Sequence, residues 1–153
     1  MNDTMTSKTL KTYSNGYTIY KPSQRGSGGA VRLNLNTEKK AIFVEAALQS
    51  GERQFDWESK IIMKWGLSDI GSVLAALQGR TSEAKLFHKT EAASSACELL
   101  IRDDPERAPY AFKISRKEQS DETARRVAIP ITHAEAALLE TALRTAAERI
   151  MGW

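Results

Sequence analysis

The sequence predicts an α+β fold in which two four-stranded antiparallel sheets are each followed by a helix. Three observations lead to this prediction. Eight short segments show the period-two alternation or continuous apolar character of strands, two segments show the spacing of amphipathic helices, and each helix follows four of the strands. No repeat of individual residues relates the two halves, so the repetition is one of element order.

Residues 1 to 15 are polar and show no periodicity, so we expect a disordered leader followed by a single domain over residues 16 to 153. The stretch 17 to 36 then alternates between apolar and polar side chains on both sides of a loop made of Pro, Ser, Gln, Arg and Gly. This alternation predicts two half-buried strands. The side chains expected to face the core are Tyr17, Ile19, Val31, Leu33 and Leu35.

Two further strands and a helix complete the first half. Residues 41 to 49 form a nearly continuous apolar segment, which is typical of a central strand. Residues 53 to 65 carry aromatic and aliphatic side chains at odd positions and predict a fourth strand that stops at Gly66. In the helix that follows, Ser68 is expected at the N-cap and Gly79 at the left-handed position after the last turn.

The second half repeats this order of elements. Pro130 predicts that the last strand lies at an edge of its sheet or ends there. Thr132 and Glu135 then form a capping-box pattern, which predicts the start of an alanine-rich helix that runs to Trp153. The four strand-like segments before that helix are separated by polar or proline-containing turns and cover residues 84 to 90, 95 to 103, 110 to 117 and 125 to 131.

The composition favours an anionic partner and excludes several other classes. The net charge is +3 and the sequence pI is about 9.0, which favours acidic ligands without indicating a polybasic tail. No apolar run approaches the ~20 residues that cross a bilayer, and the N-terminus lacks the apolar core of a signal peptide, so we expect a cytoplasmic protein. A single cysteine, Cys97, and two histidines allow neither an internal disulfide nor a recognisable metal motif, and we expect no cofactor.

Nothing in the sequence predicts catalysis. The closest pair of acidic groups, Asp56 and Glu58, is expected on one face of the fourth strand, where two carboxylates are commonly solvated. No Ser, His and Asp signature accompanies them. We therefore expect a protein that is not an enzyme.

Several outward strand faces combine cations with aromatic or amide side chains. Binding of a single strand needs this mixture, because cations follow the phosphates while rings stack on bases, each ring contributing ~1–3 kcal/mol. The loop between the first two strands adds hydrogen-bond donors and glycines that let the backbone approach a phosphate closely. The candidate nucleic-acid-binding residues are Tyr20, Lys21, Ser23, Gln24, Arg25, Arg32, Asn34, Lys60, Lys64, Lys85, Lys89 and Lys113.

Structural interpretations compete with this one. Cations on outer strand faces are often simply solvated and keep sheet edges from aggregating, and the glycine-rich loop is also compatible with a mobile hairpin connection. Trp57 and Trp65 are expected as anchors in the core or in a subunit interface, because large aromatic side chains are mostly buried. Cys97 is expected to be a buried inert thiol, and His88 fits either the core or a phosphate contact.

Five segments, taken in their order and spacing, carry a family resemblance. They are YTIYK at residues 17 to 21, FDWESK at 55 to 60, LSDIGSVLAAL at 67 to 77, LFHKT at 86 to 90 and IPITHAEAALL at 129 to 139. Together they resemble the Whirly proteins of plants and, more distantly, the PUR-repeat and mitochondrial guide-RNA-binding proteins. The resemblance implies binding of single-stranded nucleic acid, two antiparallel sheets that pack together, and helices that join subunits into a dimer or tetramer. The lysine-rich KGKAAL motif of the plant proteins is absent, and its nearest counterpart is RGSGGAV at residues 25 to 31.

We therefore predict a homo-oligomeric protein that binds single-stranded DNA, or RNA, with little sequence preference and acts in regulation or protection. The alternative is a protein-interaction or assembly module that has the same fold and binds no nucleic acid. The absence of the lysine-rich motif keeps that alternative open.

Overall fold

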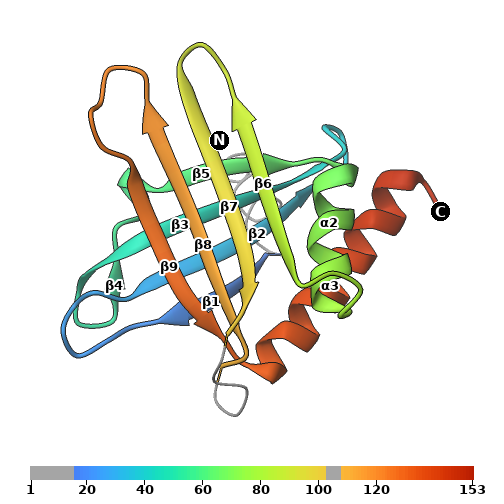
Figure 1. Cartoon of the computed structure of the whole chain (residues 1–153), viewed down its shortest axis with the longest axis horizontal. Coiled ribbons are helices and arrows are strands. Elements are labelled where there is room, and N and C mark those ends of the chain that lie inside the picture. The colour runs from blue at the N-terminus through green and yellow to red at the C-terminus, as the bar shows by residue number, and fades with distance from the viewer. Residues whose placement is uncertain (1–15, 103–107) are drawn as a thin grey trace, which may run out of the picture.

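The computed structural model describes residues 16–102 and 108–153, so the leader expected at residues 1–15 lies outside the described residues. Within them, two antiparallel sheets and two helices follow one another in the expected order (Figure 1). The elements are β1 (Tyr17–Lys21), β2 (Gly29–Asn36), β3 (Ala41–Gly51), β4 (Gln54–Phe55), the 3₁₀ turn η1 (Trp57–Ser59), β5 (Ile61–Trp65), α2 (Leu67–Leu77), β6 (Glu83–Lys89), β7 (Ala93–Ile101), β8 (Tyr110–Glu118), β9 (Arg125–Ile131) and α3 (His133–Met151). The predicted α+β class is confirmed.

In the first sheet, β1, β2 and β3 are consecutive neighbours, and both β4 and β5 pair with the remaining side of β3. The single fourth strand predicted over residues 53 to 65 is therefore wrong in detail. Asp56 breaks it, because its side chain accepts a hydrogen bond from the backbone N–H of Ser59 (3.3 Å) and starts the turn η1. Asp56 and Glu58 consequently lie in a turn and do not share a strand face.

In the second sheet, β6, β7, β8 and β9 are joined in sequence order as antiparallel neighbours. The strand β9 forms one edge of this sheet, as Pro130 predicted. Pro130 lies opposite Ala111, and the proline is exposed. A residue without a backbone N–H is tolerated at such an edge because no further strand needs that donor.

In both helices an acidic side chain of the first turn binds the backbone N–H of the N-cap residue, but the N-cap of α2 is not the residue that the sequence predicts. Gly66 and not Ser68 is the N-cap of α2, and its backbone N–H donates to the carboxylate of Asp69 at 3.1 Å. The helix ends as predicted, with Gly79 in the left-handed region at φ 74°. The predicted capping box of α3 is present, because Thr132 and Glu135 bond reciprocally between side chain and backbone at 3.0 and 3.1 Å. Neither described helix is long and apolar enough to cross a membrane.

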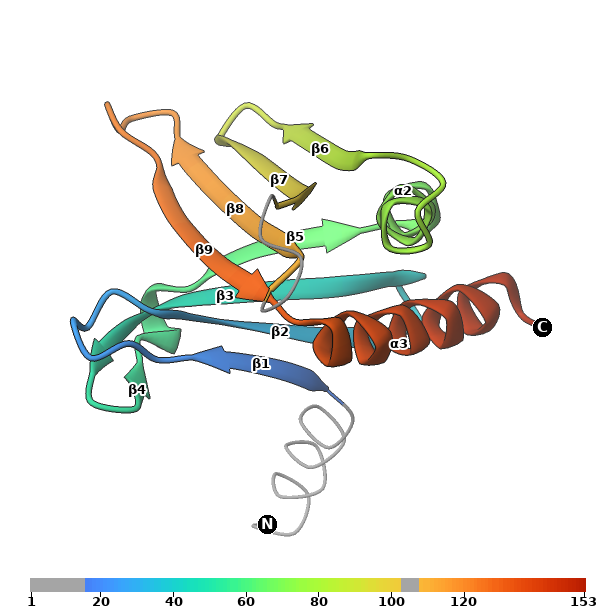
Figure 2. The same ribbon diagram turned by 60° about the horizontal axis from the view of Figure 1, so that its bottom comes forward.

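The core lies between the inner faces of the two sheets and the helices that close the open side of the wedge (Figure 2). Trp65 of β5 is completely buried, and its ring lies 6.2 Å from that of Phe112 in β8. The two sheets meet most closely where β9 crosses β2. A Cβ atom placed on Gly29 would come within 2.7 Å of Val127 and 3.2 Å of Ile129, so a glycine allows this approach. The outer faces of the sheets consequently point away from each other.

Candidate nucleic-acid interface

The outer face of the first sheet, called the first outer face below, is set by the strand alternation. Antiparallel register places its side chains in rows that run across the strands, about 6.6 Å apart along each strand. The first row runs from Tyr20 through Ala30 to Ala47, and the second joins Arg32, Glu45 and Ile62. The third row consists of Asn34, Phe43 and Lys64.

The first row carries an aromatic pair above small residues. The rings of Tyr20 and Phe55 lie 5.7 Å apart with their planes tilted by 46°. Ala30 and Ala47 between them are buried, whereas Tyr20 is 56% exposed. Because the alanines leave room on the sheet, two large rings can lie over it and still present an open aromatic surface. Tyr20 therefore has the position expected of a stacking residue.

The second row carries a charged cluster with a tryptophan. Nε and Nη2 of Arg32 both donate to one carboxylate oxygen of Glu45, at 2.9 and 2.7 Å. Nζ of Lys60 lies 3.1 Å from the other oxygen of Glu45. The guanidinium carbon of Arg32 lies 4.2 Å from the centre of the Trp57 ring. This distance corresponds to a cation–π contact, so Arg32 is held by both a carboxylate and an aromatic ring.

The third row carries an exposed lysine beside a half-buried ring. Lys64 is exposed beside Phe43, and Nζ of Lys39 lies 5.8 Å from the centre of the Phe43 ring. Asn34 contributes an amide on the other side of Phe43. This row offers one available strand cation, one ring and one amide, which is the mixture that single-strand binding needs.

The loop between β1 and β2, residues 22–28, is fastened by one side chain of β3. Oε1 of Gln49 accepts from the backbone N–H groups of Ser23 and Gly28, both at 2.9 Å. Nε2 of Gln49 donates to the carbonyls of Ser23 (3.1 Å) and Gly51 (3.0 Å). Three of these hydrogen bonds join Gln49 to the loop, and the fourth stays within β3, so the base of the loop is tied to the first sheet.

The tip of this loop faces a second basic residue. Arg25 and Arg53 line one hollow together with Gly26, Gln49 and the acidic Glu52. Gly26 has a φ of 75°, and its N–H donates to the carbonyl of Ser23 at 3.1 Å, so the turn at the tip requires a glycine. Gln24 and Arg25 are exposed at the end of the first sheet.

Lys21 lies apart from the other candidates of the first sheet. It alternates to the inner side of β1, where its Nζ lies 2.7 Å from the carboxylate of Glu135 at the start of α3. Partial burial raises the pKa of Glu135, but hydrogen bonds from Lys21 and Thr132, with the charge of Lys21, outweigh burial and hold that pKa below its ordinary value. The charge of Lys21 therefore stabilises the ionised Glu135 at the start of α3.

The outer face of the second sheet, the second outer face below, is a separate basic surface. Phe87 is 65% exposed on the edge strand β6, between Lys85 and Lys89. Lys85 is partly neutralised by Glu83, whose carboxylate lies 3.1 Å away and raises the pKa of the lysine by hydrogen bonding and charge. Further members of this face are Glu98, Lys113, Lys117 and Arg126.

The predicted candidates thus fall into three groups. Five lie together on the first outer face, three lie in the adjoining loop, and three lie on the second outer face, which points away from the first; Lys21 lies on the inner side of β1. The three groups are Tyr20, Arg32, Asn34, Lys60 and Lys64; Ser23, Gln24 and Arg25; and Lys85, Lys89 and Lys113.

Sequence reasoning missed the role of Trp57. Trp65 is a core anchor as expected, but Trp57 is only half-buried, belongs to η1 and contacts Arg32 on the first outer face. The available signal was the Asp56 to Ser59 spacing, which permits a side-chain cap and a turn in the middle of an otherwise strand-like segment. Phe43, Phe55 and Gln49 were not singled out either, because their importance depends on cross-strand register.

Cys97 and His88, two further side chains with chemically reactive groups, lie on the inner side of the second sheet. Cys97 is buried, and desolvation raises the pKa of its thiol strongly, as expected of an inert cysteine. His88 alternates to the inner side of β6, where Nε2 lies 3.1 Å from the carboxylate of Asp69. It therefore does not join Lys85 and Lys89 on the second outer face.

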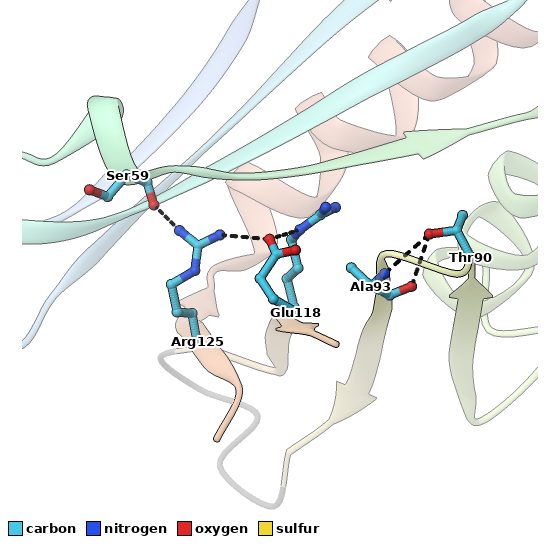
Figure 3. A network of polar contacts seen from close by, with 6 residues as sticks. Ser59, Thr90, Ala93, Glu118 and Arg125 are labelled. Atoms are coloured by element: carbon cyan, nitrogen blue, oxygen red, sulfur yellow. Dashed lines mark hydrogen bonds and ion pairs between the residues drawn. The ribbon is translucent and has the colours of Figure 1, made fainter. Parts of the chain in front are cut away.

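Arg125 of the second sheet contacts the turn η1, which adjoins the first sheet. Arg125 of β9 donates from Nη1 to the carbonyl of Ser59 in η1, and its Nη2 lies 4.0 Å from the carboxylate of Glu118 (Figure 3). Glu118 also accepts from Nε of Arg116 at 2.8 Å, and this hydrogen bond lowers the pKa of Glu118. The turn that presents Trp57 is therefore held at Ser59, whose N–H binds Asp56 and whose carbonyl binds Arg125.

Comparison with known proteins gives consistent matches. The family model described as Whirly transcription factor matches residues 22–142. Mitochondrial single-stranded DNA-binding protein WHY2 of Arabidopsis thaliana is 28% identical over 130 residues, which are 82% of this chain and 52% of that protein. The chain thus spans about half the length of the curated relatives it matches.

Two solved structures share the fold. The crystal structure of WHY1 from Arabidopsis thaliana superposes with a TM-score of 0.74 at 20% identity, covering 91% of this chain and 86% of that one. A guide-RNA-binding protein complex bound to a guide RNA gives a TM-score of 0.64 at 12% identity, covering 90% and 92%. At these identities the likeness concerns the fold.

Proposed function

Because this chain belongs to the Whirly family, we propose that it binds single-stranded DNA, or RNA, with little sequence preference, and that it regulates or protects the strand without catalysing a reaction. The relatives named as single-stranded DNA-binding proteins support DNA as the first choice. The structural neighbour bound to a guide RNA supports testing RNA beside it.

The first outer face is the single observation that carries this proposal. It joins aromatic side chains to cations over three rows of one sheet, and the glycine-containing loop adjoins it at one end. Aromatic planes stack on any base, and cations follow the backbone whatever its sequence, so this chemistry predicts affinity with little sequence preference.

Fluorescence anisotropy tests the proposal with a labelled oligonucleotide, single-stranded and duplex in parallel, across a salt titration. We expect tighter binding to the single strand, with log K falling against log salt at a slope of about −0.7 per neutralised phosphate. Lys64→Met should make this slope shallower by about 0.7, because Lys64 is the exposed cation of the third row. Failure of both nucleic acids to bind at low salt would overturn the proposal.

A matched comparison separates the two basic faces. Lys113→Met removes one exposed cation from the second outer face, as Lys64→Met does from the first. If the first outer face is the principal site, Lys64→Met weakens binding of a short strand more than Lys113→Met does. The reverse order would move the site to the second sheet.

An assembly module is the second candidate, and exposed apolar side chains favour it. Leu138 is 57% exposed on α3, and Met151 and Trp153 are exposed at its end. We propose that these residues take part in a homo-oligomer. Light scattering coupled to size exclusion measures the mass of the particle, and Leu138→Glu should lower that mass if the surface is used. A particle that assembles but binds no oligonucleotide would favour the second candidate.

The cytoplasmic location belongs to the same proposal. Curated relatives of this chain are mitochondrial in one case, WHY2 of Arabidopsis thaliana, and chloroplastic in another, WHY1 of Solanum tuberosum, so location has to be measured for this chain itself. Fractionation of the producing cells, followed by detection of the full chain, gives the answer. Recovery from an organelle fraction would contradict the cytoplasmic proposal and leave the binding proposal standing.

A further inference from the structure

We infer that the Arg32–Trp57 stack is a binding position for an unpaired base, and that Glu45 is the positioning residue that turns Arg32 from a phosphate contact into part of a stacking surface. This inference rests on the proposed binding of single-stranded nucleic acid and specifies what one part of the first outer face recognises. It is carried by three observations of the second row.

The first observation is how the donors of Arg32 are used. The Nε and Nη2 edge of the guanidinium, which would otherwise grip a phosphate in bidentate fashion, is directed at Glu45. The side chain of Arg32 is 21% exposed and that of Glu45 only 14%. An ion pair so shielded from water is held in one arrangement, and a phosphate competing for the same edge would have to displace a carboxylate already in place.

The second observation is the charge of the cluster. Glu45 also holds Lys60, through its second oxygen at 3.1 Å, so one carboxylate is shared by two cations. The attraction of this row for a polyanion is therefore smaller than the number of its cations suggests. Neutralisation of charge leaves the planar groups of this row intact, and both guanidinium and indole groups can stack on bases.

The third observation is that the backbone carrying the indole is anchored independently of Arg32. Asp56 caps the turn η1, and Arg125 from the other sheet binds the carbonyl of Ser59 in the same turn. The backbone at Trp57 is therefore ordered without a ligand, which lowers the ordering cost of stacking a base there. The Tyr20 and Phe55 rings lie one row away, so consecutive bases meet consecutive stacking surfaces.

The test compares a single strand with an abasic strand of the same length and charge. Arg32→Lys keeps the charge and removes the planar group, and we expect it to weaken binding of the base-containing strand about tenfold while leaving the abasic strand and the salt slope unchanged. Lys64→Met is the matched control and should weaken both strands alike. Equal affinity of Arg32→Lys and the unchanged protein for the base-containing strand would overturn the inference.

Glu45→Gln gives a second test, in which two explanations predict different base preferences. Simple electrostatics predicts tighter binding of both strands alike, with an unchanged preference, because an acidic group leaves a polyanion site. Our inference predicts that the preference for the base-containing over the abasic strand falls, because a neutral amide holds Arg32 less firmly against Trp57. An unchanged preference in a folded variant, checked by its urea denaturation midpoint, would contradict the inference.

The outcomes also separate this inference from the function on which it rests. An unchanged protein that binds neither strand refutes both proposals. A protein that binds the single strand with an unaltered base preference in Arg32→Lys and Glu45→Gln refutes only the role of the Arg32–Trp57 stack. A loss of salt slope of about 0.7 in Arg32→Gln would instead identify Arg32 as a phosphate contact.

Discussion

At the scale of single residues, the same type of side chain has different uses according to its neighbours. Lys64 and Lys21 are both lysines predicted to bind a phosphate, but Lys64 is exposed beside a ring while Lys21 is paired with Glu135 at the start of α3. Alternation along the strand predicts the side on which each lies. It cannot predict the partner of Lys21, because Glu135 is brought there only by the fold.

Lys21→Met should destabilise the fold at neutral pH by about 0.2–1 kcal/mol, the range for ion pairs at the surface. The pKa of Glu135 is lowered in the folded state, so its contribution is fully present above the unfolded pKa of about 4.3 and is lost as pH falls through the folded pKa. The difference between variant and unchanged protein should therefore be smaller at about pH 3 than at neutral pH.

Urea denaturation at the two pH values measures that difference, and Lys64→Met serves as the control because its exposed charge is not coupled to a helix start. A difference that stays constant between neutral pH and about pH 3 would show that Lys21 stabilises through packing of its aliphatic stem and not through Glu135.

At the scale of elements, periodicity predicted the strands and capping chemistry predicted the helices, because both signals are local. Thr132 and Glu135 mark the start of α3 correctly, whereas the N-cap predicted at Ser68, a good capping residue, is wrong for α2. The N-cap is Gly66, whose N–H donates to Asp69. The turn η1 was missed because its aromatic residues fit a strand pattern equally well.

The candidate site was predicted in part for the same reason. The outward direction of Tyr20 and Arg32 follows from alternation within one strand. The contacts of Arg32 with Glu45 and Trp57 require the register between β2 and β3 and the position of a turn, and neither is encoded in the local pattern. The sequence therefore predicts which side chains face outward but not which of them meet.

At the same scale, the order of the loop of residues 22–28 depends on its hydrogen bonds with Gln49. Gln49→Ala removes an acceptor from the N–H groups of Ser23 and Gly28, so these amides should exchange with solvent about tenfold faster or more, since each lost bond is worth about 0.5–1.5 kcal/mol. Affinity for a single strand should fall severalfold, because the loop has to be ordered during binding.

Hydrogen exchange followed by NMR and the anisotropy assay measure the two effects on one sample. Gln119→Ala, at an exposed amide side chain in the second half of the chain, is the matched control and should change neither. Faster exchange at Ser23 and Gly28 with unchanged affinity would show that the fastening of the loop has no part in binding.

At the scale of the whole molecule, the packing of two sheets depends on a position without a side chain. Gly29→Ala places a methyl group 2.7 Å from Val127, so β9 has to shift away from β2, and overpacking of this kind costs about 1–3 kcal/mol. Gly71→Ala in α2 meets nothing within 4 Å and should stabilise the fold by up to about 1 kcal/mol.

The two alanine variants share one chemical change and should move the free energy of unfolding in opposite directions, as measured by urea denaturation. A Gly29→Ala variant as stable as the unchanged protein would show that β9 can slide over β2 without cost. The contact between β2 and β9 would then be deformable and not rigid.

The opposed directions of the first and second outer faces bear on stoichiometry. One short strand covers a single face of a protomer, and the far side remains available to another strand. If both faces bind, each protomer is saturated by two short oligonucleotides. A strand long enough to pass around the edge of the sheets occupies both faces, so one such strand saturates a protomer. The apparent site size would then depend on the length of the probe used to measure it.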